Sequence, residues 1–351
     1  MMNIVILLAV VLIVAILVTI FRAHTLVQVV RGKEGDPMGT SNKVNGALFM
    51  VFMILGTAWF FGYSYTEFDR YTVPVASEHG EVTFKLFWIT TAITTAVFII
   101  TNAVLFYFAW RYRYKADQKA HFYSHNNTLE MIWTFIPAVV LTGLVLSGLF
   151  AWQDITSKAP ANAEVIEIFG YQYAWASRYP GPDGKLGPSD YKLIDSDNRL
   201  GVDFSNPNAK DDFLPREIHI PKGEPVLLKI RARDVIHSVY MPHFRLQMNA
   251  VPGLPTQFWF IPTKSTADMA AETGNPDFQY ELVCNKICGK AHFSMRAIVV
   301  VDEKEDYEKW KAEQKSWLSK NPDYLANIEA TSPVQVAVEE KVSGEEVNTS
   351  L

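Results

Sequence analysis

Residues 131–152 read MIWTFIPAVVLTGLVLSGLFAW and contain no charged side chain. As an α-helix this run would be about 33 Å long, which matches the roughly 30 Å hydrocarbon core of a bilayer. It also divides the sequence in two. Similar uncharged runs precede it, whereas the chain after Trp152 alternates between short apolar and polar segments. The run therefore predicts a membrane span at the end of a membrane-embedded half.

Three earlier runs have the same character, at residues 1–21, 44–65 and 86–110. Buried helices of a soluble protein are the alternative, but such helices normally keep a polar face. The first run could instead be a cleaved signal peptide. However, no basic residue precedes it, it exceeds the usual apolar core of a signal, and FRAH at residues 21–24 is not a small-residue cleavage site. We expect four membrane helices.

The loops between these runs differ in charge. The first and third loops are rich in lysine and arginine, whereas the second carries Glu67, Asp69, Glu78 and Glu81. Because basic loops stay in the cytoplasm, this pattern predicts that the N-terminus and everything after Trp152 lie outside.

The second half has the pattern of β-strands. Apolar residues alternate at Tyr171, Tyr173 and Trp175, at Ile218 and Ile220, and through residues 226–230. Residues 221–225, PKGEP, form a turn, and further strands are expected at residues 257–261, 279–283 and 296–301. Together they predict a small β-sandwich or barrel outside the membrane.

Three segments fall outside this pattern. Residues 180–212, rich in glycine, proline and asparagine, are predicted to form a long exposed insertion. Residues 303–320 are predicted to form one solvent-facing helix, which Tyr307, Trp310 and Trp317 would dock on the domain. The acidic residues 321–351 are predicted to be disordered.

Composition excludes several classes of protein. The net charge is -5 and there is no basic run, so binding of nucleic acid by the usual electrostatic route is not expected. Two cysteines are too few for a disulfide scaffold, a multi-cysteine zinc module or an iron–sulfur cluster.

Both cysteines lie in residues 284–295, CNKICGKAHFSM, together with His292 and Met295. Thiolates and thioethers are soft ligands that suit copper, and imidazole suits it as well. Residues 234–237, DVIH, offer a second imidazole. Two alternatives stay open, a Cys284–Cys288 disulfide and a zinc site that would leave Met295 unused. His243 is a further candidate ligand.

This motif, with the preceding DVIH and residues 251–253, VPG, resembles subunit II of cytochrome c oxidase and its dinuclear copper A centre. The resemblance extends over about residues 86–317 and includes residues 126–137, NNTLEMIWTFIP. It implies a cupredoxin-like β-barrel at residues 160–302 and a transmembrane hairpin at 84–153, whereas the two extra helices within 1–65 lie outside the usual two-span architecture of the family. It also implies that the coppers are held by Cys284 and Cys288 as bridging thiolates, by His237, His292 and Met295, and by the backbone carbonyl of Lys286.

Some positions depart from the family pattern. Lys286 and Asn249 stand where the family usually has carboxylates near a magnesium ion, so we expect no magnesium ligand from the side chains of this chain. Tyr173 stands where electrons usually enter through a tryptophan, and either Tyr173 or Trp175 could take this role, or both could be strand core residues. Asp234 could hydrogen-bond near His237 or form part of a docking face.

Glu130 has two interpretations. The matching residue in the family lies at the mouth of a proton-uptake channel of subunit I. Independently, Asn127 followed by Glu130 is a capping-box pattern at a helix start.

The resemblance implies that the chain accepts electrons from a cytochrome c, or a cytochrome c domain, and passes them to the haem of subunit I. That subunit would reduce oxygen to water with proton pumping, beside a subunit III. The chain would be a multi-pass protein of a bacterial inner membrane, with its N-terminus and copper domain in the periplasm. The extra helices would contact lipid and dock a quinol-oxidising complex. Alternatives are a copper-free subunit II of a quinol oxidase and a structural membrane protein with a disulfide. Nitrous oxide reductase has a similar copper loop but needs a propeller domain that this length excludes.

Overall fold

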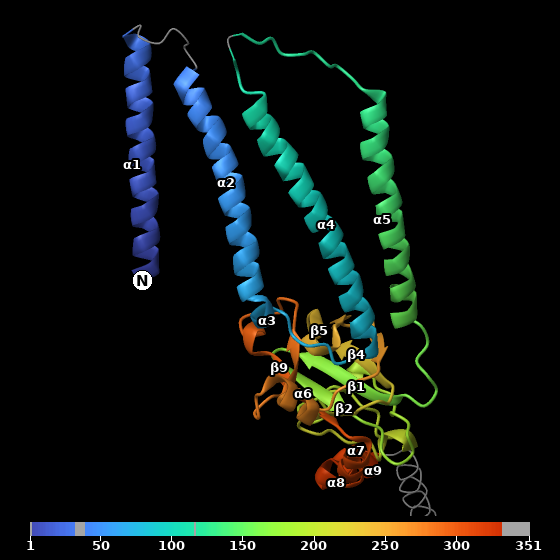
Figure 1. The fold of residues 1–351 in the computed structure, drawn as a ribbon. Helices are drawn as coiled ribbons and strands as arrows, with labels where there is room; N and C mark the ends of the chain where they lie inside the picture. The colour runs from blue at the N-terminus through green and yellow to red at the C-terminus, as the bar shows by residue number, and fades with distance from the viewer. Residues whose placement is uncertain (1, 32–38, 116, 332–351) are drawn as a thin grey trace, which may run out of the picture. The chain divides into compact units, whose positions relative to one another are not determined.

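The structure is a computed structural model that describes residues 2–31, 39–115 and 117–331. Its four long helices are α1 (Met2–Val30), α2 (Gly39–Thr66), α4 (Glu78–Arg111) and α5 (Asn127–Ile155) (Figure 1). All four are long and apolar enough to cross a membrane, so the prediction of four spans is confirmed. The chain divides into two units, one made of residues up to Thr72 and Ile89–Val140, the other of Val73–Trp88 and the residues from Leu141 onward.

The helical unit exposes most of its apolar side chains, as expected of surfaces that face lipid. Within it α2 packs on α4, where the ring of Phe49 lies 5.7 Å from that of Phe106. The start of α5 corrects one expectation. The cap is Asn126 and not Asn127, because Asn126 Oδ1 accepts a hydrogen bond from the amide of Leu129. Glu130 Oε1 accepts one from the amide of Asn126 at 3.4 Å.

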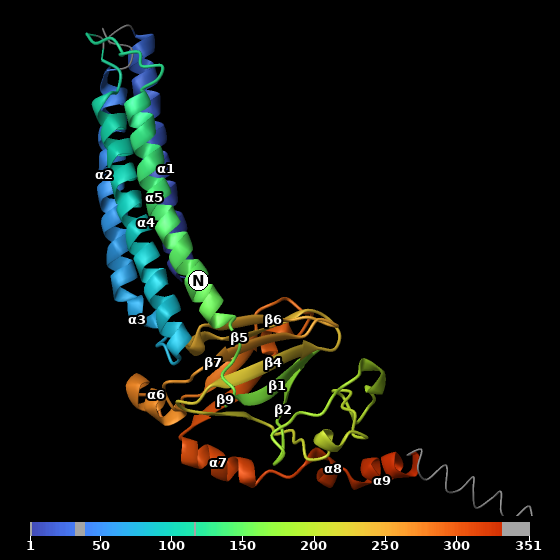
Figure 2. The same cartoon turned by 90° about the vertical axis from the view of Figure 1, so that its right-hand side faces the viewer.

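The second unit is built on two β-sheets (Figure 2). The four-stranded sheet has the order β2-β1-β4-β7 and the five-stranded sheet has the order β3-β9-β8-β5-β6. The strands are β1 (Glu164–Tyr171), β2 (Ala174–Arg178), β3 (Ile218–Pro221), β4 (Val226–Ala232), β5 (His237–Met241), β6 (Leu246–Ala250), β7 (Thr256–Phe260), β8 (Tyr280–Cys284) and β9 (Arg296–Asp302). Short helices lie between the strands: α6 (Thr266–Thr273) and the 3₁₀ turns η1 (Tyr191–Leu193), η2 (Pro207–Ala209), η3 (Pro242–Phe244) and η4 (His292–Ser294). The short helix α3 (Phe68–Tyr71) follows α2 and belongs to the helical unit.

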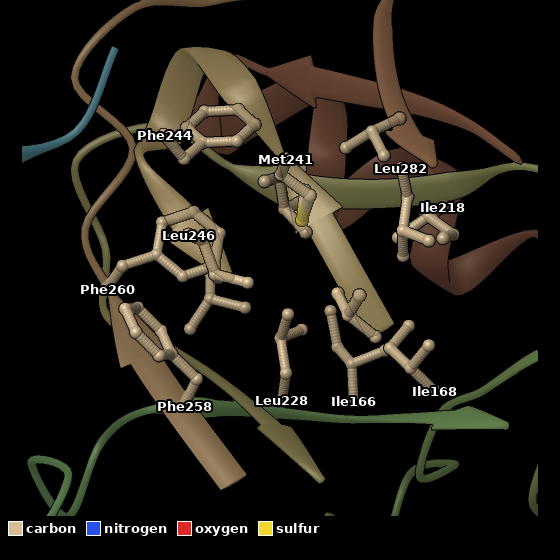
Figure 3. Packing of buried hydrophobic residues seen from close by; sticks show 14 of the residues in the cluster. Ile166, Ile168, Ile218, Leu228, Met241, Phe244, Leu246, Phe258, Phe260 and Leu282 are labelled. Atoms are coloured by element: carbon tan, nitrogen blue, oxygen red, sulfur yellow. The ribbon is translucent and has the colours of Figure 1, made fainter. Parts of the chain in front are cut away.

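The core of this β domain lies between the two sheets (Figure 3). Ile166, Leu228 and Phe258 point inward from the four-stranded sheet, and Met241 and Leu282 meet them from the other (Figure 3). The alternation of buried and exposed residues along β4 and β8 follows from the period of two in a strand. The two-sheet domain that the alternation predicts is confirmed.

The aromatic alternation at residues 171–175 does not form one strand, as the sequence led us to expect. β1 ends at Tyr171 and β2 begins at Ala174, so Gln172 and Tyr173 form the turn of a hairpin. The peptide bond between these two residues is cis. Tyr173 therefore lies in a turn and not in a strand.

The insertion at residues 180–212 is less exposed than expected. Leu200, Val202 and Phe204 are buried in a second core that also includes Phe169 of β1 and Leu318. Arg178 fastens the insertion to the sheet, because its buried guanidinium lies 2.6 Å from Glu167 and 2.7 Å from Asp212.

The segment 303–320 is not one helix. It forms α7 (Lys304–Ala312) and α8 (Trp317–Lys320), and α9 (Pro322–Thr331) follows them (Figure 2). The break occurs because Ser316 caps a new helix by accepting a hydrogen bond from the amide of Ser319, while Trp317 stacks on Phe204. Residues 322–331 are helical and not disordered, and the rest of the predicted tail lies outside the described residues.

Candidate metal centre

Adjacent strands position the candidate ligands. His237 begins β5 and Cys284 ends β8, and these strands pair so that Val239 lies opposite Cys284. The remaining candidates lie in the loop from Cys284 to Met295, which closes on itself because the amide of Cys284 donates to the carbonyl of Met295. One strand end and one loop therefore supply all the candidate groups.

The structure brings these groups close together. The Sγ atoms of Cys284 and Cys288 are 3.9 Å apart, and His237 Nδ1 lies 3.9 Å from Cys284 Sγ. On the other side, Cys288 Sγ lies 3.7 Å from His292 Nδ1 and 3.8 Å from Met295 Sδ. The carbonyl oxygen of Lys286 lies 3.3 Å from Cys284 Sγ. His237, Lys286, His292 and Met295, the other four ligands that the resemblance implies, thus lie around the sulfur atoms of Cys284 and Cys288.

Most of this site is shielded from solvent. His237, Cys284, Cys288 and Met295 are buried, and Trp175 and Val235 pack against the cluster of sulfur atoms. Both cysteines are free thiols. Burial, reinforced by the neighbouring Cys284, raises the pKa of the Cys288 thiol to about 11. The metal-free site therefore holds a protonated Cys288 at neutral pH, and a metal must displace that proton.

Asp234 orients His237. Its Oδ1 lies 3.0 Å from His237 Nε2, so that nitrogen can donate to the carboxylate while Nδ1 faces Cys284 Sγ. Burial acts to raise the pKa of Asp234, but hydrogen bonds from the amide of Gln172 and from His237 outweigh it and lower the pKa. Of the two roles considered for Asp234, the structure supports the hydrogen bond to the histidine.

The hairpin turn of β1 and β2 contacts the loop. The amide of Lys290 donates to the hydroxyl of Tyr173, and Gln172 Nε2 donates to the carbonyl of Cys288 at 2.5 Å. Gly289 makes this approach possible, because a Cβ atom there would lie 2.4 Å from Tyr173 Oη, and its φ of +136° is one that other residues rarely adopt. Sequence reasoning missed Gln172, since nothing in its local pattern marks the turn.

Trp175 lies in β2, two residues after Tyr173. Its ring is 5.8 Å from that of His237 in an edge-to-face arrangement. Gly170 leaves room for both rings, since a Cβ atom there would lie 2.8 Å from Trp175 and 3.2 Å from His237. Tyr173 is 37% exposed, whereas Trp175 is half-buried.

His243, the further candidate ligand, lies elsewhere. Its ring is edge-to-face with those of Phe278 and Tyr280. Asn249 pairs with Ser238 between β6 and β5, and the side chain of Lys286 is exposed.

Two family models match the chain. Residues 65–150 match the transmembrane domain of cytochrome c oxidase subunit II, and residues 165–302 match its periplasmic domain. The helices before residue 65 lie outside both matches.

Individual relatives carry the same description. The chain is 32% identical over 276 residues to the alternative cytochrome c oxidase subunit 2 of Bradyrhizobium diazoefficiens, covering 77% of this chain and 92% of the relative. It is 27% identical to cytochrome c oxidase subunit 2 of Cereibacter sphaeroides, covering 78% of this chain and 87% of the relative. Among solved structures, the periplasmic domain of subunit II from Bradyrhizobium japonicum is 23% identical to this chain, with a TM-score of 0.30. The match covers 44% of this chain and 95% of the chain in that structure.

Proposed function

Because this chain belongs to the cytochrome c oxidase subunit II family, and so to a haem–copper oxidoreductase, we propose that its β domain holds a dinuclear copper A centre. The centre would receive electrons from a cytochrome c, or a cytochrome c domain, and pass them to the haem of subunit I. That subunit, beside a subunit III, would reduce oxygen to water with proton pumping.

The observation that carries this proposal is the donor set around the two cysteines. The two buried thiols lie 3.9 Å apart, each has one imidazole Nδ1 within 4 Å, and the thioether of Met295 lies 3.8 Å from Cys288 Sγ. Such soft sulfur donors with imidazole suit copper, whereas magnesium and calcium require oxygen ligands. The thiols are 3.9 Å apart, well beyond the roughly 2.05 Å of a disulfide bond. The pair of sulfur atoms fits a bridging role between two ions better than it fits a structural crosslink.

Bound copper would supply a one-electron carrier, and the surrounding residues of this chain would bind, orient and shield it. Cys284 and Cys288 would bridge the ions, His237 and His292 would each bind one, and Met295 and the carbonyl of Lys286 would complete the set. Zinc would leave Met295 without a role. Since Lys286 and Asn249 replace carboxylates, we propose that no side chain of this chain binds magnesium.

We place electron entry at Tyr173, because it is more exposed than Trp175 and its hydroxyl is bonded to the ligand loop. Trp175 contacts His237 and would shield the centre.

Glu130 would serve proton uptake in addition to its contact with the helix cap. Replacing it with glutamine should lower oxidase turnover and change its pH dependence. If both stay unchanged, only the capping role remains.

The uncharged helices and the basic loops support a place in a bacterial inner membrane, with the N-terminus and the β domain in the periplasm. We propose that α1 and α2, which precede the family match, contact lipid and dock a quinol-oxidising complex. Deletion of residues before Tyr65 should then release a co-purifying partner, and retention of all partners would contradict this role.

Copper content of the purified full-length chain tests the main proposal. We expect two coppers per chain and a seven-line mixed-valence paramagnetic signal. Met295→Leu should alter that signal, whereas the matched change Met241→Leu, at another buried methionine, should not. A chain that binds no copper would instead support a copper-free quinol-oxidase-type subunit or a structural protein with a Cys284–Cys288 disulfide.

A further inference from the structure

The Gln172–Tyr173 turn is held at three points. The amide of Gln172 donates to Asp234 Oδ2 at 2.9 Å, its side-chain Nε2 donates to the carbonyl of Cys288 at 2.5 Å, and Tyr173 Oη accepts from the amide of Lys290 at 3.2 Å. Two of these bonds lead to the loop and one leads to the segment before β5. A two-residue hairpin turn needs none of them to form, since the ladder of β1 and β2 closes it.

These bonds connect candidate ligands from two different elements. Asp234 holds Gln172 through Oδ2 and His237 through Oδ1. The side chain of Gln172 then reaches the carbonyl of Cys288. A continuous path of hydrogen bonds therefore links His237 at the start of β5 to Cys288 in the loop, and it passes through the turn that carries Tyr173.

The bond to Cys288 has a chemical consequence. An N–H donor fixes the peptide between Cys288 and Gly289, and with it the direction in which Cys288 Sγ points. Hydrogen bonds and dipoles near a cysteine ligand also tune the reduction potential of its copper. The acceptor is partly buried, so water can replace the lost donor only in part.

We propose that Gln172 is a positioning residue that sets the geometry of the copper loop through its hydrogen bond to the Cys288 carbonyl. In doing so it keeps Tyr173, the proposed point of electron entry, against the loop and connects it to the thiol of Cys288. This inference rests on the proposed copper function, but its structural part does not depend on bound metal.

The test compares three variants of the full-length chain in detergent. Gln172→Leu removes the donor, and leucine is preferred to methionine because a thioether beside the loop would add a copper ligand. Gln172→Glu keeps the shape but replaces the donor with an acceptor. Gln314→Leu is the matched control, because Gln314 also donates from its side chain to a backbone carbonyl, that of Trp310, in α7.

In the metal-free chain we measure hydrogen exchange of the amides of residues 289–292. Loss of one hydrogen bond worth about 1 kcal/mol should speed their exchange about fivefold in both Gln172 variants, and the control should match the wild type. If Gln172 acted only through its shape, Gln172→Glu would behave as the wild type, and this result would overturn the proposal. Unchanged exchange in Gln172→Leu would overturn it as well.

In the copper-loaded chain we measure copper affinity, the paramagnetic signal and the midpoint potential. Removal of such a supporting partner typically costs about 10- to 100-fold in affinity or activity, and we expect a loss in that range with a shifted potential in both variants. Signals and affinity equal to those of Gln314→Leu would refute the tuning role. If the wild type binds no copper while the exchange difference persists, the proposed function fails and the positioning role stands.

Discussion

His243 should make the β domain sensitive to acid. Its ring lies edge-to-face against Phe278 and Tyr280, and among the described groups its buried Nδ1 has no hydrogen-bond partner. Burial, assisted by the positive charge of Arg245, lowers the pKa of His243 to about 4 from an ordinary value of 6.5. The neutral ring is therefore the form that fits this site.

The sign and size of the effect follow from this difference. Between pH 6.5 and pH 4 the unfolded chain binds a proton that the folded chain does not, so stability is present above pH 6.5 and is lost as the pH falls toward 4. A difference of about 2.5 pKa units corresponds to about 3 kcal/mol. His243→Phe keeps a ring between Phe278 and Tyr280 but cannot be protonated.

Urea unfolding of the metal-free full-length chain in detergent, followed by near-UV circular dichroism, checks this at pH 7 and pH 4. When the pH is lowered from 7 to 4, we expect the free energy of unfolding of the wild type to fall by about 3 kcal/mol more than that of His243→Phe. His125→Gln changes an exposed histidine and serves as the control. Parallel pH dependences of the wild type and His243→Phe would refute the reasoning.

Three further changes test other parts of the domain. Gly289→Ala should lower stability by about 1–3 kcal/mol, because of the strained φ and the clash with Tyr173; urea unfolding measures this, and an unchanged midpoint would contradict it. Arg178→Met should cost about 3 kcal/mol, because it leaves the buried Asp212 without its cationic partner, whereas Glu167 keeps Arg231; a loss below 1 kcal/mol in the same assay would show that the ion pairs are dispensable. Ser265→Ala should cost about 1 kcal/mol, because Ser265 caps α6 in a capping box; faster amide exchange confined to α6 is the expected signature.

The features that depend on local pattern could be predicted from the sequence. Four uncharged runs correspond to four long helices, and alternation placed both ends of β7, β8 and β9 to within one residue. Both patterns are strong because one environment acts on the whole element. Lipid favours apolar residues throughout a membrane span, and the core favours an apolar residue at every second position of a strand.

The features that depend on partners distant in the sequence could not be predicted. The turn at Gln172 and Tyr173 interrupts an alternation that looks continuous, and its bonds to the loop join positions more than 110 residues apart, which no local pattern records. Likewise, the helix after β9 breaks before Trp317 because that ring stacks on Phe204 of the insertion. Most candidate ligands were identified because their residue types cluster in residues 284–295, whereas Gln172, which supports the loop, lies 116 positions from Cys288.

The second core has a consequence for exchanging parts of the chain. Phe204 stacks on Trp317, and Tyr324 donates to Asp195, so the insertion and the helices α8 and α9 fold against each other. A chimera that receives the insertion of a relative alone would pair it with foreign helices and expose Trp317. The insertion and residues 316–331 should therefore be transplanted together, as one module formed by two separate stretches of sequence.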